Sequence, residues 1–416
     1  MNDRLHVLVH GTLDAGVCDF LRVGAFVEPL AALGVDVRPW SSFSEDALNG
    51  GSPSGPIPLG AARDEAGATL WALGMTALAW ADVVVFRRWH ATVMACSSCG
   101  DPVPSLDALA EHTATTGHLS LTPDLTLAPL VELLERHPEL LAGRGVLYET
   151  DDDVLGVPDW TGLGRSSRAE APLIRRTIAL ADLVTVTTPV LAGRLAPAAR
   201  GEVRVVRNAV DPAWYAPPPG APEPAPGLRL AYHGAPARLR DYEVARAAVD
   251  AAAASSPGAR RLWLGAAHEP RCAALVDEAL PWVEGVPAFA AALAAARPSV
   301  GVAPLADDPY NLARSELHWL EYAAVGAPAV CSAFGGPGPY DPVRDGVDGL
   351  LARTPADWAR HLAALAGSPG LRADLAGAAR ERVLRDYGPA ARAAEWARAY
   401  RDAAALGRSR RRLPGS

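Results

Sequence analysis

Short apolar runs alternate with helix-like stretches along most of this chain, and this alternation restricts its fold more than any other feature. The predicted strands are Leu5–His10, Val35–Arg38, Ala81–Phe86, Gly145–Glu149, Leu183–Thr187, Val203–Val206, Leu228–His233, Arg261–Leu264, Ser299–Ala303 and Pro328–Ser332. The predicted helices between them are Phe20–Leu33, Leu125–Arg136, Ala169–Ala181, Asp241–Ala253 and Leu317–Val325. Nearly continuous Val and Leu in the strands indicates burial on both sheet faces. The pattern therefore predicts an α/β protein with parallel, doubly wound sheets.

A proline-rich segment divides this pattern into two halves. Pro212–Pro226 carries seven prolines in fifteen residues, a density that disfavours helix and central strand and favours a stiff, extended connector. We therefore predict an N-terminal domain over residues 1–211, a linker over 212–227 and a C-terminal domain over 228–387. The alternative is a surface loop within one domain.

A long helical run from Pro355 to Leu406 lies near the C-terminus. We predict a C-terminal helix and basic tail over residues 388–416. The tail ends in Arg408, Arg410, Arg411 and Arg412. We expect these side chains to be solvated, and a peripheral contact with anionic lipid stays open as an alternative.

All 39 cationic side chains are arginines, because the sequence contains no lysine. This excludes a pyridoxal-phosphate Schiff-base enzyme and a standard P-loop, since both need a lysine. The net charge of −8 provides no overall positive field for nucleic acid. Five cysteines do not make a disulfide scaffold, and the chain begins without a basic and apolar leader. We therefore expect a cytoplasmic protein.

Polar residues that suit a nucleotide follow two predicted strands of the second half. Gly234, Arg238 and Arg240 come after Leu228–His233, and Asn311, Arg314, Ser315 and Glu321 come after Ser299–Ala303. Glycine permits close backbone approach, and guanidinium groups match phosphate oxygens. A carboxylate can accept two hydrogen bonds from a vicinal diol such as a ribose. A single Glu on a helix is usually solvated. The prediction of a ligand cleft therefore rests on the order in which all these polar residues follow the two strands.

These segments resemble those of a known family. The passage Val205-Val206-Arg207-Asn208-Ala209-Val210-Asp211, followed by Leu230-Ala231-Tyr232-His233-Gly234, resembles the interdomain segment of GT-B glycosyltransferases. The stretch from Ala303-Pro304-Leu305 through Asn311 and Ser315 to Trp319-Leu320-Glu321-Tyr322-Ala323-Ala324-Val325-Gly326-Ala327-Pro328 resembles their donor-binding helix, and Arg344–Leu351 the loop after it. Arg22–Pro29 and Tyr148–Asp153 add to the likeness. The group is the retaining, GT4-like one (glycosyl transferases group 1), and the resemblance covers about residues 5–387.

The resemblance implies two Rossmann-like domains facing each other across a cleft, and transfer of a sugar from a nucleoside-diphosphate sugar to a hydroxyl acceptor. It also implies retention of configuration and no catalytic metal. Glu321 would hold the ribose hydroxyls, and Arg238 and Arg240 the diphosphate. The acceptor, whether a glycan, a lipid-linked saccharide or a small molecule, stays open.

The sequence departs from the family pattern at two points. The family often has Glu-x7-Glu, and the first Glu would fall at Ala313. Asp307, Asp308 and Asn311 are candidates for its contact with the donor sugar. Many members bind the phosphate with a lysine. In this chain Arg240 or Arg314 would have to replace that lysine.

The catalytic residues are less clearly marked than the donor residues. No obvious nucleophile or base stands in the sequence. His10 follows the first predicted strand, and Arg87, Arg88 and His90 follow Ala81–Phe86, so these side chains are the candidates to face the cleft. A structural role is the alternative for a strand-end histidine.

The sharpest local motif is Cys96-x2-Cys99-x12-His112-x5-His118, which has the spacing of a Cys2His2 zinc site. We predict structural Zn²⁺ in an insert over residues 94–120. The alternative is a nucleic-acid or protein-binding finger. The insert contains acidic residues and no arginine, which argues against phosphate contacts, so we expect no nucleic-acid partner.

A second metal-related motif gives the rival enzyme hypothesis. The triplet Asp151-Asp152-Asp153 follows a predicted strand, and a DxD motif would suit a Mn²⁺-dependent glycosyltransferase. The triplet lies in the first half, whereas the donor-like residues lie in the second. We therefore favour a loop that lines the cleft on the acceptor side, with a capping role as the alternative.

Overall fold

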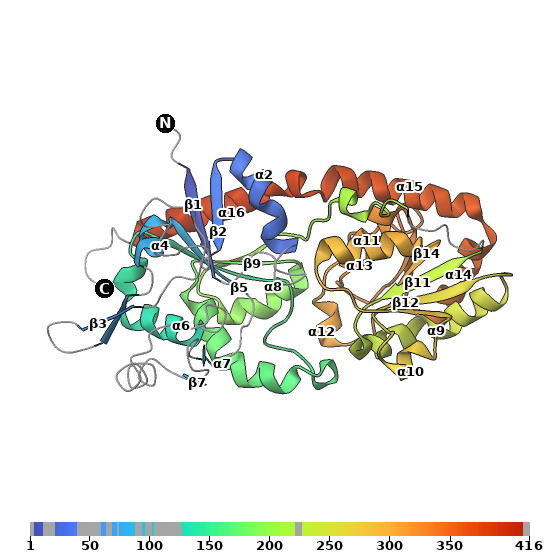
Figure 1. Ribbon diagram of the computed structural model, residues 1–416, viewed down its shortest axis with the longest axis horizontal. Helices are drawn as coiled ribbons and strands as arrows, with labels where there is room; N and C mark the ends of the chain where they lie inside the picture. The colour runs from blue at the N-terminus through green and yellow to red at the C-terminus, as the bar shows by residue number, and fades with distance from the viewer. Residues whose placement is uncertain are drawn as a thin grey trace.

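The computed structural model describes residues 4–10, 21–39, 60–63, 69–72, 75–87, 94–95, 102–103, 127–220 and 227–410. Six predicted site residues lie outside these ranges: Arg88, His90, Cys96, Cys99, His112 and His118. The described chain forms two α/β domains that stand side by side in Figure 1.

The N-terminal domain is built on a parallel six-stranded sheet. Its strands are β1 (Leu5–Val9), β2 (Val35–Pro39), β5 (Val83–Arg87), β8 (Gly145–Thr150), β9 (Leu183–Val186) and β10 (Glu202–Val205). They lie in the order β10-β9-β8-β5-β1-β2, and all neighbours are parallel. Every residue of β5 and β8 is buried, as expected for strands covered on both faces.

The C-terminal domain holds a second parallel six-stranded sheet. Its strands are β11 (Arg229–His233), β12 (Arg260–Leu264), β13 (Glu278–Leu280), β14 (Val300–Ala303), β15 (Ala329–Ser332) and β16 (Leu350–Ala352). The order β13-β12-β11-β14-β15-β16 is the 3-2-1-4-5-6 order of dinucleotide-binding folds. Strand order reverses between β11 and β14, and ligands bind such sheets at the carboxyl ends of these two strands.

Helices cover the sheets of both domains. The helices are α2 (Val27–Ala32), α4 (Met75–Trp80), α6 (Leu127–Arg136), α7 (Gly164–Leu180), α8 (Pro189–Leu195), α9 (Leu239–Ala254), α10 (Pro270–Ala273), α11 (Val286–Ala296), α12 (Pro309–Leu312), α13 (Leu317–Val325), α14 (Pro355–Gly367), α15 (Pro369–Asp386) and α16 (Pro389–Arg410). The 3-10 turns are η1 (Gly24–Phe26), η4 (Pro138–Leu141), η5 (Asp159–Thr161), η6 (Ala196–Ala198), η7 (Pro212–Tyr215) and η8 (Pro236–Arg238). Short antiparallel pairs are β3 (Gly60–Arg63) with β4 (Thr69–Ala72) and β6 (Met94–Ala95) with β7 (Pro102–Val103).

The predicted parallel α/β architecture is confirmed, and each of the predicted strands occurs within two residues of its predicted ends. The sequence reading missed β13 and β16, which have only three residues each. The predicted helix Phe20–Leu33 was wrong as one element, because the structure breaks it into η1 and α2. Pro29 explains the break, since it lacks the N–H that a continuous helix would need there.

The predicted helical run from Pro355 is three helices rather than one. Ser368 ends α14 and caps α15, accepting a hydrogen bond from the N–H of Leu371. Pro369 and Pro389 each stand at the start of a helix, where the missing N–H costs nothing.

Helix α16 returns to the N-terminal domain, as Figure 1 shows. Trp396 and Tyr400 are fully buried in the core of that domain, against β1 and β5 residues such as Val7 and Val85. Arg410 donates to the carbonyl oxygen of Arg144 and to Asp182 at 2.8 Å. The Arg410 side chain is still 41% exposed, so it is solvated as predicted, but it belongs to α16 and is bonded to the N-terminal domain rather than frayed. Arg411 and Arg412 lie outside the described residues.

The proline-rich segment begins as a compact turn. Pro212–Tyr215 forms η7, capped by the Asp211 carboxylate, which accepts from the N–H of Ala213 at 2.8 Å. Pro212 and Tyr215 are buried, and Tyr215 belongs to the core of the C-terminal domain. The turn therefore packs the start of the linker between the domains against the C-terminal domain. Residues 221–226 lie outside the described chain.

Candidate functional site

The site predicted from the sequence lies at the reversal point of the C-terminal sheet. His233 is the last residue of β11, and Gly234 follows it with φ +146°, a conformation that favours glycine. The Gly234 carbonyl accepts a hydrogen bond from the indole N–H of Trp263 at 2.9 Å. The backbone therefore turns away from the sheet at the strand end where such folds bind ligands.

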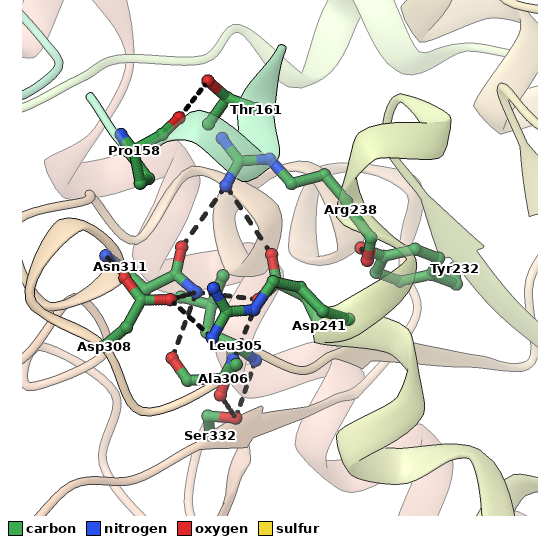
Figure 2. Close-up of polar contacts among 11 residues, drawn as sticks. Pro158, Thr161, Tyr232, Arg238, Asp241, Leu305, Ala306, Asp308, Asn311 and Ser332 are labelled. Atoms are coloured by element: carbon green, nitrogen blue, oxygen red, sulfur yellow. Dashed lines mark hydrogen bonds and ion pairs between the residues drawn. The ribbon is translucent and has the colours of Figure 1, made fainter. Parts of the chain in front are cut away.

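Arg238 is held inside a polar network rather than presented to solvent (Figure 2). Its guanidinium donates to Oδ1 of Asn311 at 3.3 Å and lies 3.6 Å from the carboxylate of Asp241. The rings of Trp160 and Tyr310 lie 5.1 and 5.6 Å from the guanidinium carbon. The predicted diphosphate ligand Arg238 is thus already engaged by two polar partners and two aromatic rings.

Asn311 uses its amide within the protein. Its Nδ2 donates to Asp241 at 2.7 Å, to the Ala306 carbonyl at 3.0 Å and to Asp308 at 3.2 Å. With Oδ1 taken by Arg238, these bonds leave little capacity for a ligand. These bonds show that Asn311 holds the loop after β14, and its role as a donor-binding residue stays a prediction.

Arg240 is the more accessible of the two arginines on this loop. Its side chain is 40% exposed and lies 3.3 Å from the Asp308 carboxylate. Its guanidinium carbon also lies 4.8 Å from the ring of Trp160, which belongs to η5 of the N-terminal domain. One tryptophan therefore contacts both predicted phosphate-binding arginines across the domain interface. Of the candidates for the missing Glu, Asp308 is thus paired and Asp307 is exposed.

Residues 313–316 connect the donor side to the N-terminal domain. The hydroxyl of Ser315 accepts from Nδ2 of Asn208 at 2.8 Å, and Glu316 pairs with Arg207 at 3.2 Å. Glu316 is fully buried, and burial raises its pKa. The positive charge of Arg207 lowers the pKa, but by less than burial raises it. Among the described residues, Nη1 of Arg314 is buried and has no hydrogen-bond partner. Arg314 therefore offers an unused charged donor at the predicted phosphate position.

The departure at Ala313 has a structural reason. Ala313 is 1% exposed and belongs to the hydrophobic core of the N-terminal domain. Its carbonyl accepts from the hydroxyl of Thr188 at 2.9 Å. A glutamate at this position would bury a carboxylate in apolar surroundings, which is costly without a partner.

Helix α13 carries Glu321 and is fixed firmly against β11. The Tyr322 hydroxyl donates to the Ala231 carbonyl at 2.7 Å, and the Trp319 indole donates to the Asp348 carbonyl at 2.7 Å. The Tyr322 ring fits over Gly301 of β14, where any Cβ would overlap it. Glu321, one residue before Tyr322, is therefore held rigidly beside the end of β11.

Glu321 lies in a buried cluster with His233 and His318. Oε2 of Glu321 is 3.3 Å from Nε2 of His233, and the two histidine rings are 4.2 Å apart. Burial raises the pKa of Glu321 to about 8 and lowers the pKa of His233 to about 3. It also lowers the pKa of His318. Burial therefore disfavours the charged form of each of the three side chains.

The N-terminal candidates lie at the matching edge of their own sheet. His10 follows β1 and Arg87 ends β5, the two strands at which that sheet reverses order, and both side chains are buried. Arg87 and Arg22 donate to Glu149 at 3.0 and 2.6 Å. Burial alone would raise the pKa of Glu149, but the two guanidinium groups outweigh this effect, and the pKa of Glu149 is lowered. Arg87 therefore has a structural partner, and His10 remains the described catalytic candidate.

Asp153 of the acidic triplet has a charged partner within its own domain. Asp153 is buried and pairs with Arg194 of α8 at 2.7 Å. The carboxylate is thus neutralised within the N-terminal domain, which favours a structural role for Asp153 over a donor-metal site.

Three residues of the site were not predicted from the sequence. His233 and His318 stand in the segments that carry the resemblance, and the spacing of His318 and Glu321, three apart on a helix, is a signal for one shared face. No sequence signal marks Trp160, because only the tertiary fold brings η5 to the loop after β11.

A family model described as glycosyl transferase-like matches residues 240–398. The C-terminal domain is glycosyltransferase-like. The match covers most of the C-terminal domain, including Arg240, Arg314 and Glu321, and it confirms the predicted enzyme class, a glycosyltransferase. A search of the curated proteins found no sequence match.

Solved structures show that the glycosyltransferase-like domain is part of a shared two-domain fold. Sucrose-phosphate synthase from Thermosynechococcus elongatus aligns over 96% of this chain and 98% of its own, with TM-score 0.54 and 16% identity. Anabaena HepE in complex with UDP-glucose aligns over 95% and 99%, with TM-score 0.53 and 12% identity. A glycosyltransferase from Rickettsia africae aligns over 97% and 99%, with TM-score 0.56 and 12% identity. The predicted GT-B arrangement of two Rossmann-like domains is therefore confirmed at the level of fold.

Among the described helices, none is long and apolar enough to cross a membrane.

Proposed function

We propose that this protein transfers a sugar from a nucleoside-diphosphate sugar to a hydroxyl acceptor. The observation that carries the proposal is the buried Nη1 of Arg314, which has no hydrogen-bond partner among the described residues. Leaving a buried donor unpaired costs about 1–3 kcal/mol. A diphosphate beside Arg314 would satisfy this donor, and Glu321, held beside His233 at the end of β11, would take the ribose.

The residues have distinct roles in this proposal. Glu321 accepts hydrogen bonds from the ribose hydroxyls, and Arg314 donates to the diphosphate. Arg240 is accessible and pairs with Asp308 near the surface, so a phosphate competes with that carboxylate at little cost. Arg238 positions the loop through Asn311 and Asp241 rather than contacting the donor. Because HepE was solved with UDP-glucose, a UDP-sugar is the donor class to test first.

The chemistry follows from the leaving group. The bond between the sugar's anomeric carbon and the diphosphate oxygen breaks, a bond to the acceptor oxygen forms, and the proton of the acceptor hydroxyl passes to the departing diphosphate. Negative charge grows on the diphosphate, where guanidinium groups stabilise it without a metal. We propose retention of configuration and binding of the acceptor on the N-terminal side near His10.

Metal independence distinguishes this proposal from the DxD hypothesis. Asp153 is paired with Arg194, so we expect turnover to persist in excess Mg²⁺ chelator. A requirement for added Mn²⁺, lost again in Asp153→Asn, would favour the DxD mechanism.

Substitution of Glu321 tests the donor site. Glu321→Gln keeps the side-chain shape but accepts fewer hydrogen bonds from a diol, so UDP binding measured by calorimetry should weaken by ~1–3 kcal/mol. Glu381→Gln is the matched control, since that side chain is 79% exposed on α15. Equal UDP affinity in wild type and Glu321→Gln would remove Glu321 from the site.

We also propose that the insert over residues 94–120 binds structural Zn²⁺ through Cys96, Cys99, His112 and His118. The support is the pairing of β6 with β7, in which Met94 faces Val103 and Ala95 faces Pro102. Cys96 and Cys99 stand in the connection between these paired strands, as the two thiolates of a Cys2His2 module do. Elemental analysis should find zinc in the purified protein, and Cys99→Ser should lose it and gain protease cleavage near the insert while both larger domains stay folded.

A further inference from the structure

His233, His318 and Glu321 place three metal-ligating atoms together in the C-terminal domain. One ligand atom from each residue lies within 4.8 Å of the other two. His233 and Glu321 are 4% and 3% exposed, and His318 is half-buried. Among the described residues, Nε2 of His233, Nδ1 of His318 and Oε2 of Glu321 are buried without hydrogen-bond partners. The three side chains therefore bring potential metal ligands together in one buried cluster.

The two elements that carry these ligands are locked together. His318 and Glu321 are three residues apart on α13, so both project from one face of the helix. The Tyr322 hydroxyl ties that helix to the Ala231 carbonyl on β11, the strand that ends in His233. Such preorganisation lowers the cost of gathering ligands around an ion.

Aromatic rings border the cluster. The rings of Phe289 and Tyr322 lie 5.2 and 5.0 Å from the His233 ring. This apolar border limits solvation of the ligands, which strengthens their interaction with a cation.

The ligand types select the class of ion. Two imidazole nitrogens and one carboxylate suit Zn²⁺, Co²⁺ and similar transition metals, whereas Mg²⁺ and Ca²⁺ favour all-oxygen sets. Three protein ligands leave one tetrahedral position for water.

The geometry points to a site for one divalent transition-metal ion of the Zn²⁺ class at His233, His318 and Glu321. The ion and the donor ribose exclude one another, because both use the Glu321 carboxylate. This second part rests on the proposed function, and the first part does not. Zn²⁺ is therefore an inhibitor that competes with the nucleotide rather than a cofactor of transfer.

Metal binding is tested first, without nucleotide, on the full-length chain. The Cys96→Ser/Cys99→Ser background removes the thiolates of the predicted zinc insert, and Co²⁺ titration is followed by visible absorption. We expect one Co²⁺ per chain and no thiolate charge-transfer band. Adding His318→Gln should weaken Co²⁺ binding by at least about tenfold, whereas His268→Gln, an exposed histidine in the same domain, should change nothing.

Two further measurements keep the test valid if the Cys96→Ser/Cys99→Ser variant does not fold. In the wild-type chain the thiolate band separates the two kinds of site, and circular dichroism checks each variant. Equal Co²⁺ affinity with and without His318→Gln would overturn the site.

Competition with UDP is tested second, with correction for the Zn²⁺–UDP complex measured without protein. Zn²⁺ should lower UDP affinity by the same factor by which UDP lowers Zn²⁺ affinity, because linkage is reciprocal. UDP binding that ignores Zn²⁺ would overturn the shared use of Glu321. Metal binding without any UDP binding would leave the metal site standing and contradict the proposed function instead.

Discussion

Arg314 has the surroundings that best fit a phosphate ligand. The other two predicted arginines have protein partners. Arg238 contacts Asn311 and Asp241, and Arg240 contacts Asp308. Arg314 keeps a buried Nη1 without a partner among the described residues. A chain without lysine needs a fixed guanidinium at this point, because guanidinium is its only permanently charged group for phosphate.

Arg314→Gln should weaken UDP binding by ~1.5–3 kcal/mol, the contribution of a hydrogen bond to a charged group. The free energy of unfolding should change little, since the lost donor has no protein partner. Calorimetry with UDP measures the first and denaturant unfolding the second. Arg398→Gln on the exposed side of α16 is the control, and equal losses of UDP affinity in both variants would contradict the role of Arg314.

Helix α16 shows how one element connects the two domains. Its Trp396 and Tyr400 complete the core of the N-terminal domain, although the helix follows the C-terminal domain in sequence. Gly407 of α16 and Gly145 of β8 let the two backbones come into direct contact. At Gly407 an added Cβ would overlap the Arg144 carbonyl, and at Gly145 it would overlap the Ala403 carbonyl.

Gly407→Ala should therefore destabilise the protein by about 1–3 kcal/mol, because the helix must shift away from β8. Gly377→Ala in α15 is the matched control: nothing lies within 4 Å of its added Cβ, so it should be neutral or stabilise the helix by up to about 1 kcal/mol. Denaturant unfolding measures both. Destabilisation of similar size in the two variants would show that close contact is not the cause.

At the scale of the whole molecule, the donor side is tied to the N-terminal domain at several points. Asn208 bonds Ser315, Arg207 pairs with Glu316 and Thr188 bonds the Ala313 carbonyl. Trp160 adds its contacts with Arg238 and Arg240. In this structure the loop around Ala313 is therefore packed between the two domains.

Trp160→Ala should shift the molecule toward a more open arrangement. Each cation–π contact contributes about 0.5–1 kcal/mol, so losing two raises the open population about fivefold or more. Small-angle scattering should show a larger radius of gyration. Trp282→Ala is the control, because that ring is 49% exposed in the C-terminal domain. An unchanged radius in Trp160→Ala would mean that the other interdomain bonds suffice to hold the domains together.

Local pattern was enough for the sheets and for part of the site. Runs of apolar residues predict buried strands because a parallel sheet covered on both faces needs them in every register position, and β5 and β8 are buried throughout. The order of Arg314 and Glu321 after β14 follows from the chain itself, and their roles toward a donor stay predictions.

Contacts between distant segments were decided by the tertiary structure. Whether Asn311 faces a ligand or the loop depends on Asp241, 70 residues earlier. Trp160, from the other domain, covers Arg238, and Ala313 is buried by N-terminal residues. The meeting of His233 with His318 and Glu321 likewise depends on the packing of α13 against β11. Amino-acid identity sets which polar and charged groups the chain can offer. Only the fold decided which are paired, because pairing requires approach in space, and spacing along the chain does not encode it.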